Sequence, residues 1–360
     1  MRKKETAKKT IDKKLLVLVL VLTFIGFVAL ADASAPLAER EFGDKFFFVK
    51  QQIMWAGIGI FSMILLSKIN YKVWEKFATP LFFVTMLSLL LVFIPGLGSE
   101  LLGARRWVFI GNFSFQPSEF VKLAMCIYLA KVASKNKKIL AFFIPVVLAS
   151  ALIMFQPDLG TTMIIAVISM SQIFISGINL FYFAGAAIAG AGASLLLILT
   201  SEYRRARLLT FLQQNGDPLG RDYHIRQILY ALGAGGLFGV GLGQSKQKFL
   251  FLPETATDSI FAIIAEEIGF VGASLIIFAF VFFILRILKI AQKAPDRFSQ
   301  VFAVGIAAWI GGQVFLNLGS MVAVVPLTGI PLPFISYGGN ALVSILSGIG
   351  ILLNISKQIS

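Results

Sequence analysis

Ten long apolar runs constrain this chain of 360 residues more than any other feature of its sequence. A helix needs about 20 mostly apolar residues to cross the hydrocarbon core of a membrane. Such runs lie near 15–33, 51–67, 78–95, 117–133, 139–155, 160–177, 179–200, 259–287, 300–325 and 338–356. Hydrophobic residues make up 58% of the chain and charged residues 14%, which is more apolar surface than a soluble protein could bury. The sequence therefore predicts an all-α polytopic membrane protein with about ten transmembrane helices, and it excludes a soluble enzyme.

Basic residues mark one side of this predicted membrane protein. On a soluble chain, a net charge of +14 would suggest nucleic acid as a partner. Here the segments 1–14, 68–76, 131–138 and 286–297, together with Lys357, hold 19 of the 32 Lys and Arg residues and only four acids. These segments therefore carry +15, and the rest of the chain carries −1. The positive-inside rule places this side in the cytoplasm with both termini, and we expect no nucleic-acid partner.

The predicted topology divides the chain into five segments. A cytoplasmic tail covers 1–14, helices one to seven cover 15–200, a large extracytoplasmic loop covers 201–258, helices eight to ten cover 259–356, and a short tail covers 357–360. Loops of that length in compact proteins are usually functional. The basic start followed by an apolar run also fits a cleaved signal peptide. We favour an uncleaved anchor, because cleavage would leave nine spans and break the charge alternation.

Two stretches of the large loop have an apolar character. Residues 202–214 place three arginines before several apolar residues, which predicts a short helix at the membrane interface. The glycine-rich stretch 224–243 fits a segment that re-enters the membrane where protein or a wet cavity shields its backbone.

Ionisable residues at the external helix ends are the candidates for function, because such groups are costly at membrane depth. Arg105 and Arg106, beside Trp107 after the third span, can bind phosphate oxygens bidentately, or they can meet lipid headgroups. Glu119 and Lys122 share one helix face, so they can form a structural ion pair or contact a substrate. The sequence leaves both alternatives open.

Two aspartates stand where predicted helices begin. Asp158 fits the N-cap position of the sixth span. Asp258 begins the eighth span, but the preceding Thr257 could cap that helix equally well, so capping explains Asp258 only weakly. The two glutamates at 266–267 lie about two turns deeper. They are either protonated, paired with a base such as Lys122, or close to a cation.

The sequence contains few residues that could bind a metal ion or form a nucleophilic catalytic triad. Cys126 is the only cysteine, which excludes an internal disulfide and a cysteine-built metal site. His224 is the only histidine and is expected in an exposed loop, so neither a multi-histidine metal site nor a Ser–His–Asp triad is favoured. The glycines at 239–243 have the spacing of a nucleotide-binding turn, but no strand is expected before them.

Six motifs together resemble the SEDS family of bacterial shape, elongation, division and sporulation proteins, over essentially the whole chain. The motifs are GARRW at 103–107, FQPSEFVKLA at 115–124, QPDLGTT at 156–162, GAGGLFGVGLGQSKQKFLFLPE at 233–254, TDSIFAIIAEE at 257–267 and PLTGIPLPFISYGGNAL at 326–342. Within the family, the chain looks more like the division branch, FtsW, than the elongation branch, RodA.

The resemblance implies a peptidoglycan glycosyltransferase that polymerises lipid II on the outer face of the bacterial cytoplasmic membrane. Asp258 matches the family's catalytic aspartate and would act as the general base. The residues expected to bind substrate are Arg105, Arg106, Glu119, Lys122, Glu254 and Thr257. No cofactor is fixed by the resemblance. The resemblance is compatible with a divalent cation bound to the departing pyrophosphate, although the sequence shows no recognisable set of metal ligands.

The family also implies a class B penicillin-binding protein transpeptidase as partner, together with other membrane proteins of the divisome or elongasome. Three alternatives stay open: a RodA-type elongation polymerase, a flippase or transporter of lipid-linked sugar, and a scaffold for the transpeptidase. The chain departs from the family pattern at Ala256 and Ser259, where His and Phe are frequent, and at Asn340, where Ser is usual.

Overall fold

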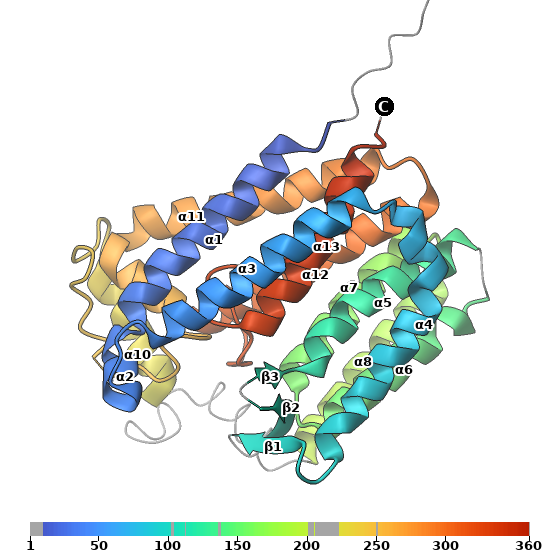
Figure 1. Cartoon of the computed structure of the whole chain (residues 1–360). Helices are drawn as coiled ribbons and strands as arrows, with labels where there is room; N and C mark the ends of the chain where they lie inside the picture. Colours follow the sequence, from blue (N-terminus) through green and yellow to red (C-terminus); the bar gives the residue numbers. More distant parts are fainter. Residues whose placement is uncertain are drawn as a thin grey trace, which may run out of the picture.

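The structure is a computed structural model that describes residues 10–101, 104–111, 113–135, 138–200, 205, 223–249 and 251–359. It is a helical bundle with one small sheet (Figure 1). Its helices are α1 (Lys13–Ala33), α2 (Ala35–Phe42), α3 (Phe47–Lys68), α4 (Tyr71–Leu90), α5 (Pro117–Ser134), α6 (Leu140–Phe155), α7 (Leu159–Ile175), α8 (Leu180–Leu199), α10 (Tyr223–Gly235), α11 (Ile260–Gln292), α12 (Arg297–Met321) and α13 (Gly339–Ser356). A short 3-10 turn, η1 (Leu91–Phe93), follows α4, and the strands are β1 (Gly98–Leu101), β2 (Ala104–Ile110) and β3 (Phe113–Phe115).

Ten of these helices, α1, α3 to α8 and α11 to α13, correspond to the ten predicted runs. Within the described residues, six are long and apolar enough to cross a membrane: α1, α3, α4 with η1, α11, α12 and α13. Helices α6 and α7 and most of α8 are apolar but shorter, and α5 carries three charged side chains. The chain is a multi-pass membrane protein, as predicted. The interfacial helix expected at 202–214 lies outside the described residues, except for Arg205.

Helix α13 lies at the centre of the bundle. All of its residues except Ala341 and Ser356 are buried, and it packs against α3 along most of its length (Figure 1). A glycine makes this close approach possible, because a Cβ on Gly350 would lie 2.6 Å from the carbonyl oxygen of Met63. Small residues let helix backbones approach closely in membranes, where association depends on packing.

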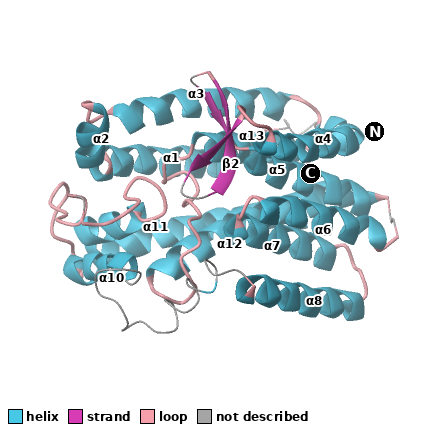
Figure 2. Cartoon of the chain, turned by 90° about the horizontal axis from the view of Figure 1, so that it is seen from below, coloured by secondary structure: helices cyan, strands magenta, loops and turns pink. Residues whose placement is uncertain are grey.

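A three-stranded antiparallel sheet, in the order β1-β2-β3, covers one end of the bundle (Figure 2). The sequence analysis did not predict this sheet. Its central strand contains the run Trp107-Val108-Phe109-Ile110, whose aromatic and β-branched residues favour extended backbone. Val108 pairs with Phe115, and the chain turns between β2 and β3 at Gly111, which has a φ of 59°. Between β1 and β2 the register shifts after the pair Ser99–Trp107, so that Glu100 pairs with Arg105 and Arg106 is an extra residue on β2.

Helix α11 is broken at Gly269, whose φ is 69°, so it is not the single continuous span that was predicted. The break is paired with the segment that follows α10. The amides of Phe270 and Val271 donate to carbonyls of 236–237, and the amides of 240–241 donate to Glu266 and Glu267. Irregular backbone at membrane depth needs such partners within the protein. The expected shielding of the 224–243 backbone is thus supplied by α11, and whether this stretch enters the membrane stays a prediction.

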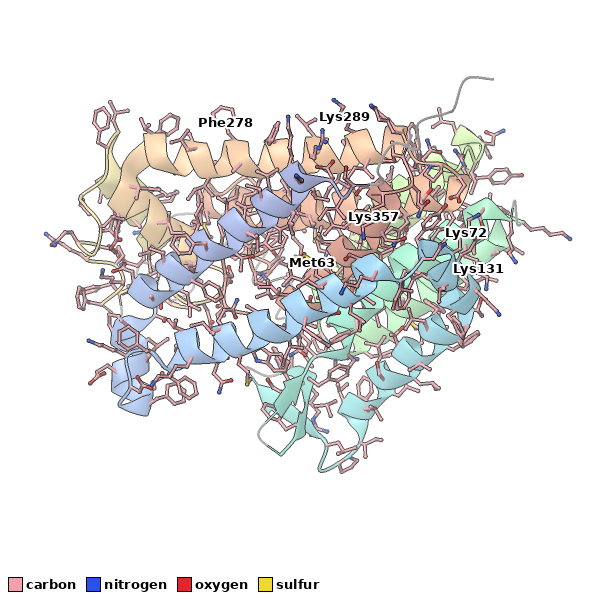
Figure 3. The ribbon with its side chains drawn as sticks, turned by 45° about the horizontal axis from the view of Figure 1, so that its top comes forward. Met63, Lys72, Lys131, Phe278, Lys289 and Lys357 are labelled. Atoms are coloured by element: carbon pink, nitrogen blue, oxygen red, sulfur yellow. The ribbon has the colours of Figure 1, made fainter. Side chains whose placement is uncertain are left out.

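The two ends of the bundle differ in what they carry. The sheet, α2 and α10 lie at the end away from the C-terminus (Figure 1). Lys72, Lys131 and Lys357, from the basic segments noted above, lie at the other end (Figure 3). The charge pattern therefore corresponds to one physical end of the molecule, and the assignment of that end to the cytoplasm stays a prediction.

Candidate functional site

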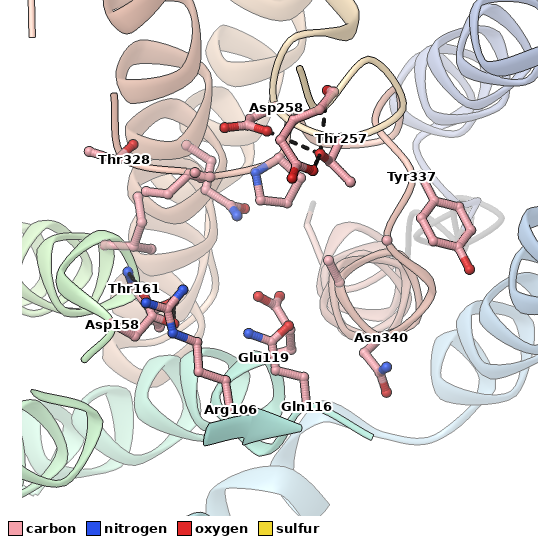
Figure 4. Close-up of a pocket in the computed structure, with 18 of the residues that line it drawn as sticks. Arg106, Gln116, Glu119, Asp158, Thr161, Thr257, Asp258, Thr328, Tyr337 and Asn340 are labelled. Atoms are coloured by element: carbon pink, nitrogen blue, oxygen red, sulfur yellow. Dashed lines mark hydrogen bonds between the residues drawn. The ribbon is translucent and has the colours of Figure 1, made fainter. Parts of the chain in front are cut away.

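A cavity of about 580 Å³ lies at the end of the bundle that carries the sheet. Its wall combines residues that are far apart in the sequence (Figure 4). Of the seven residues predicted to act on substrate, six line this cavity: Arg106 from β2, Glu119 and Lys122 from α5, and Glu254, Thr257 and Asp258 from the turn before α11. Asp258 and Glu119 face one another across the open centre (Figure 4). Arg105 is exposed and does not line the cavity.

The Asp258 turn is held by hydrogen bonds from two other elements. The Thr257 hydroxyl lies 2.8 Å from Glu254 Oε2 and 3.0 Å from Asp258 Oδ1, so it can donate to either carboxylate. From α12, Asn317 Nδ2 donates to the carbonyl oxygen of Asp258 at 2.9 Å. The amide of Tyr337 donates to the carbonyl oxygen of Ala256 at 2.8 Å. The carboxylate is therefore presented to the cavity on a turn whose backbone is fixed on both sides.

His224 belongs to this site, and the prediction that it lies in an exposed loop is wrong. It lies in α10, is half-buried and lines the cavity. Its Nε2 is 2.7 Å from the hydroxyl of Ser259, which directly follows Asp258. Ser259 is one of the positions where the chain departs from the family pattern, so the departure is matched by a contact from α10.

Glu119 and Lys122 form a buried ion pair in the cavity wall. Lys122 Nζ lies 2.7 Å from Glu119 Oε1, and their side chains are 2% and 5% exposed respectively. The ammonium also lies 5.4 Å from the ring centroid of Trp309, within the range of a cation–π interaction. Glu119 Oε2 has no hydrogen-bond partner among the described residues. Structural pairing and contact with a ligand are thus both available to this pair.

Arg106 is fixed by backbone acceptors. Its Nε donates to the carbonyl oxygen of Gln156 at 3.2 Å, and its Nη2 donates to that of Pro157. The other three guanidinium N–H groups make no hydrogen bond to the described part of the chain. Arg105 precedes it on β2 but is exposed and does not line the cavity. That both arginines bind one phosphate stays a prediction.

Asp158 caps α7, as predicted. Its Oδ1 accepts from the amide of Thr161 at 3.0 Å and its Oδ2 accepts from the hydroxyl of Thr161 at 2.8 Å. Both residues also line the cavity, so the cap is part of its wall. Other polar lining residues that the sequence analysis did not select are Gln116, Gln313, Thr328, Tyr337 and Asn340. Gln313 could have been noticed, because it is a buried amide four positions before Asn317 in an apolar helix.

Glu266 and Glu267 do not pair with Lys122. Their carboxylates bind the segment after α10, and Lys248 is the base that pairs with Glu267, with Nζ 3.0 Å from Oε1. Within the described residues, no three His, Cys, Asp or Glu side chains converge to hold a metal ion.

These features define a class of protein: a polytopic membrane protein whose helices and one small sheet surround a charged cavity at one end. Residues 13–360 match the family model described as cell cycle protein, FtsW/RodA/SpoVE. The chain belongs to this family, which is the SEDS family indicated by its motifs.

Relatives of nearly the same length carry names from this family. Stage V sporulation protein E of Bacillus subtilis is 43% identical over 361 residues, covering 98% of this chain and 99% of that protein. A probable peptidoglycan glycosyltransferase FtsW of Trichlorobacter lovleyi is 37% identical, covering 96% and 93%.

Solved structures have the same fold. A chain from a structure described as structural coordination of polymerization and crosslinking by a peptidoglycan synthase complex has a TM-score of 0.80 and 27% identity, covering 97% of this chain and 98% of that chain. The rod shape determining protein RodA of Thermus thermophilus has a TM-score of 0.72 and 26% identity, with 97% of each chain covered.

Proposed function

We propose that this chain, as a peptidoglycan glycosyltransferase, polymerises lipid II on the outer face of the cytoplasmic membrane with Asp258 as the general base. The observation that carries the proposal is the shared cavity, which has Asp258 on one wall and Arg106 and Glu119 on the other, with Lys122 paired to Glu119. The names of the relatives support the enzyme class.

The proposed reaction is one inverting glycosyl transfer. Asp258 takes the proton from the 4-hydroxyl of an acceptor N-acetylglucosamine. That oxygen forms a bond to C1 of N-acetylmuramic acid in the donor, and the bond from C1 to the pyrophosphate oxygen breaks. The electron pair leaves with undecaprenyl pyrophosphate, and the configuration at C1 inverts. Holding both sugars in one cavity would supply further rate acceleration through orientation.

Positive charge opposite Asp258 suits the departing pyrophosphate. Arg106 keeps three N–H groups for phosphate oxygens while two carbonyl groups hold its plane in place. Lys122 adds a positive charge in a site where water is largely excluded, and Glu119 fixes its position. Glu254 and Thr257 complete the Asp258 turn and would contact the acceptor sugar.

Three wider features belong to the same proposal. Both termini lie in the cytoplasm, and the cavity opens outside. The partner is a class B penicillin-binding protein transpeptidase, and the synthase complex among the structural neighbours supports such a partnership. The role is septal synthesis in division. Relatives named FtsW at 35–37% identity support this role.

The test is polymerisation of lipid II by the purified chain in complex with its transpeptidase partner. We expect long glycan chains from the wild type and none from Asp258→Asn. Asp44→Asn is the matched control, because Asp44 is a half-buried aspartate outside the cavity. Long chains from folded, partner-bound Asp258→Asn would refute the base assignment. Full-rate translocation of lipid-linked sugar without polymerisation would instead indicate the flippase alternative.

A separate test addresses the septal role. The gene is expressed in cells depleted either of their FtsW or of their RodA. Restored division in the first strain, without restored rod shape in the second, is the expected result. The reverse pattern would assign the chain to elongation.

A further inference from the structure

A buried charged cluster lies outside the cavity, between α1, α11 and the segment after α10. Its members are Asp32, Lys248, Glu266 and Glu267, and none of them lines the cavity. Lys248 is 4% exposed, and the two glutamates are 2% and 5% exposed. A charged side chain is stable in a buried position only when it is paired and hydrogen-bonded. We therefore expect each of these charged groups to have close partners within the protein.

The two glutamates bind the backbone of a single loop. Glu267 accepts hydrogen bonds from the amides of Gly243 and Ser245, both at 3.0 Å, and from Lys248 Nζ, also at 3.0 Å. Glu266 accepts from the amide of Lys246 at 3.1 Å and from the hydroxyl of Ser245. Every carboxylate oxygen of the pair therefore has a donor from residues 243–248. We call this arrangement the carboxylate clasp.

Lys248 connects the carboxylate clasp to α1. Its Nζ lies 2.7 Å from Asp32 Oδ1, at the end of α1, as well as 3.0 Å from Glu267 Oε1. Burial lowers the pKa of Lys248, but hydrogen bonds to Asp32 and Glu267 outweigh this effect and raise the pKa above its usual value. The ammonium therefore stays charged and keeps both contacts at neutral pH.

The clasp acts on the helical segment that carries Asp258. The break at Gly269 makes 260–268 a short, separate helix. Asp258 stands two residues before this helix, and Glu266 and Glu267 stand at its other end. Because the segment is short and rigid, any rotation allowed at the glutamate end would move the aspartate end. Hydrogen bonds from Asn317 Nδ2 and the Tyr337 amide hold the aspartate end, whereas the clasp and the amides of 240–241 hold the glutamate end.

We propose that Lys248 and the carboxylate clasp orient the 260–268 helix and thereby position Asp258 for proton transfer. Lys248, Glu266 and Glu267 are positioning residues in this account, and the inference rests on the function proposed above. Loss of the clasp should leave substrate contacts in place, because its members do not line the cavity. It should lower the rate of the chemical step, because general-base catalysis depends on the geometry of the base.

The experiment compares Lys248→Met with Lys248→Arg in the complete complex. Two quantities are measured: kcat and KM for lipid II polymerisation, and amide hydrogen exchange over residues 223–268. For Lys248→Met we expect kcat to fall roughly 10- to 100-fold and KM to change by less than about threefold. Exchange should rise about tenfold in 243–249 while α12 and α13 keep their protection. Lys248→Arg keeps the charge and should restore most of kcat.

The matched control is Lys50→Met, which makes the same change at an exposed ion pair with Asp44 and should alter neither quantity. Faster exchange in 243–249 with wild-type kcat would overturn the proposal, and so would unchanged exchange in Lys248→Met. A rise in exchange over all helices would also overturn it, because Lys248 would then support the whole fold. Hydrogen exchange is measured without substrate turnover, so it tests the clasp independently of the proposed reaction. The proposed function is tested separately, because polymerisation by Asp258→Asn would refute it.

Discussion

Glu119 and Lys122 form an ion pair that is almost completely removed from water. Lys122→Met leaves the Glu119 carboxylate buried without its cation, which costs about 3–5 kcal/mol when one partner of such a pair is removed. Thermal unfolding in detergent should therefore show a clearly lower Tm. The double variant Glu119→Gln with Lys122→Met removes both charges and should recover much of that loss. If the double variant lost as much stability as the sum of the losses in the two single variants, this account of the ion pair would be contradicted.

Asp158 contributes to stability through two hydrogen bonds to Thr161 at the start of α7. Asp158→Ala removes this cap and should cost about 1 kcal/mol in unfolding free energy. Asp158→Asn keeps a capping oxygen and should cost much less. If both variants unfold like the wild type, Asp158 serves the cavity rather than the helix.

At the residue scale, motifs in the sequence identified six of the cavity residues, including Asp258 and Arg106. The other contacts in the cavity join elements that are distant in the sequence, so no local sequence pattern could predict them. His224 reaches Ser259 only because α10 packs on α11. Arg105 and Arg106 looked equivalent in the sequence, and only the folded structure shows that Arg106 lines the cavity while Arg105 is exposed.

At the scale of elements, the contact between α10 and α11 depends on glycine. A Cβ on Gly235 would lie 2.2 Å from the carbonyl oxygen of Ala265. Gly235→Ala must therefore push the two elements apart, at a cost of about 1–3 kcal/mol, with loss of polymerisation as Asp258 moves. Gly233→Ala is the matched control, because it lies in the same helix with open space around it. We expect it to be neutral or to stabilise α10 by up to about 1 kcal/mol. Equal stability of the two variants would contradict the close packing.

Hydropathy predicted all ten long helices because each is a long apolar run. It could not predict the break in α11, since the isolated Gly269 looks like any glycine within a helix until its partner segment is known. The sheet was missed for a related reason. Residues 98–115 lie between two apolar runs and were interpreted as a loop, although their aromatic and β-branched residues suit paired strands.

At the scale of the whole molecule, the charge pattern predicts that Lys72 and Lys45 lie on opposite sides of the membrane. The chain suits cysteine labelling, because its one cysteine, Cys126, is buried. A membrane-impermeant maleimide should label Lys45→Cys in intact cells and label Lys72→Cys only after permeabilisation. Both lysines are exposed, so access to the reagent is limited by the membrane alone. Labelling of Lys72→Cys in intact cells would invert the proposed topology.

The multi-pass helical architecture and the position of Lys72, Lys131 and Lys357 at one end followed from the sequence, because hydropathy and charge are one-dimensional patterns. The cavity did not follow, since it needs the folded arrangement of β2, α5, α7, α10, α12 and the turn at 254–258. What the structure adds is the placement of the Asp258 carboxylate in one cavity with Arg106 and the buried Lys122.

The most direct measurement is the initial rate of undecaprenyl pyrophosphate release from saturating lipid II by the purified complex. For Asp258→Asn the account predicts a rate roughly 10²–10⁴ lower than that of the wild type, which is the usual contribution of a general base. Asp44→Asn should retain the wild-type rate. A rate for Asp258→Asn within about twofold of the wild type would contradict the central claim that Asp258 accepts the proton.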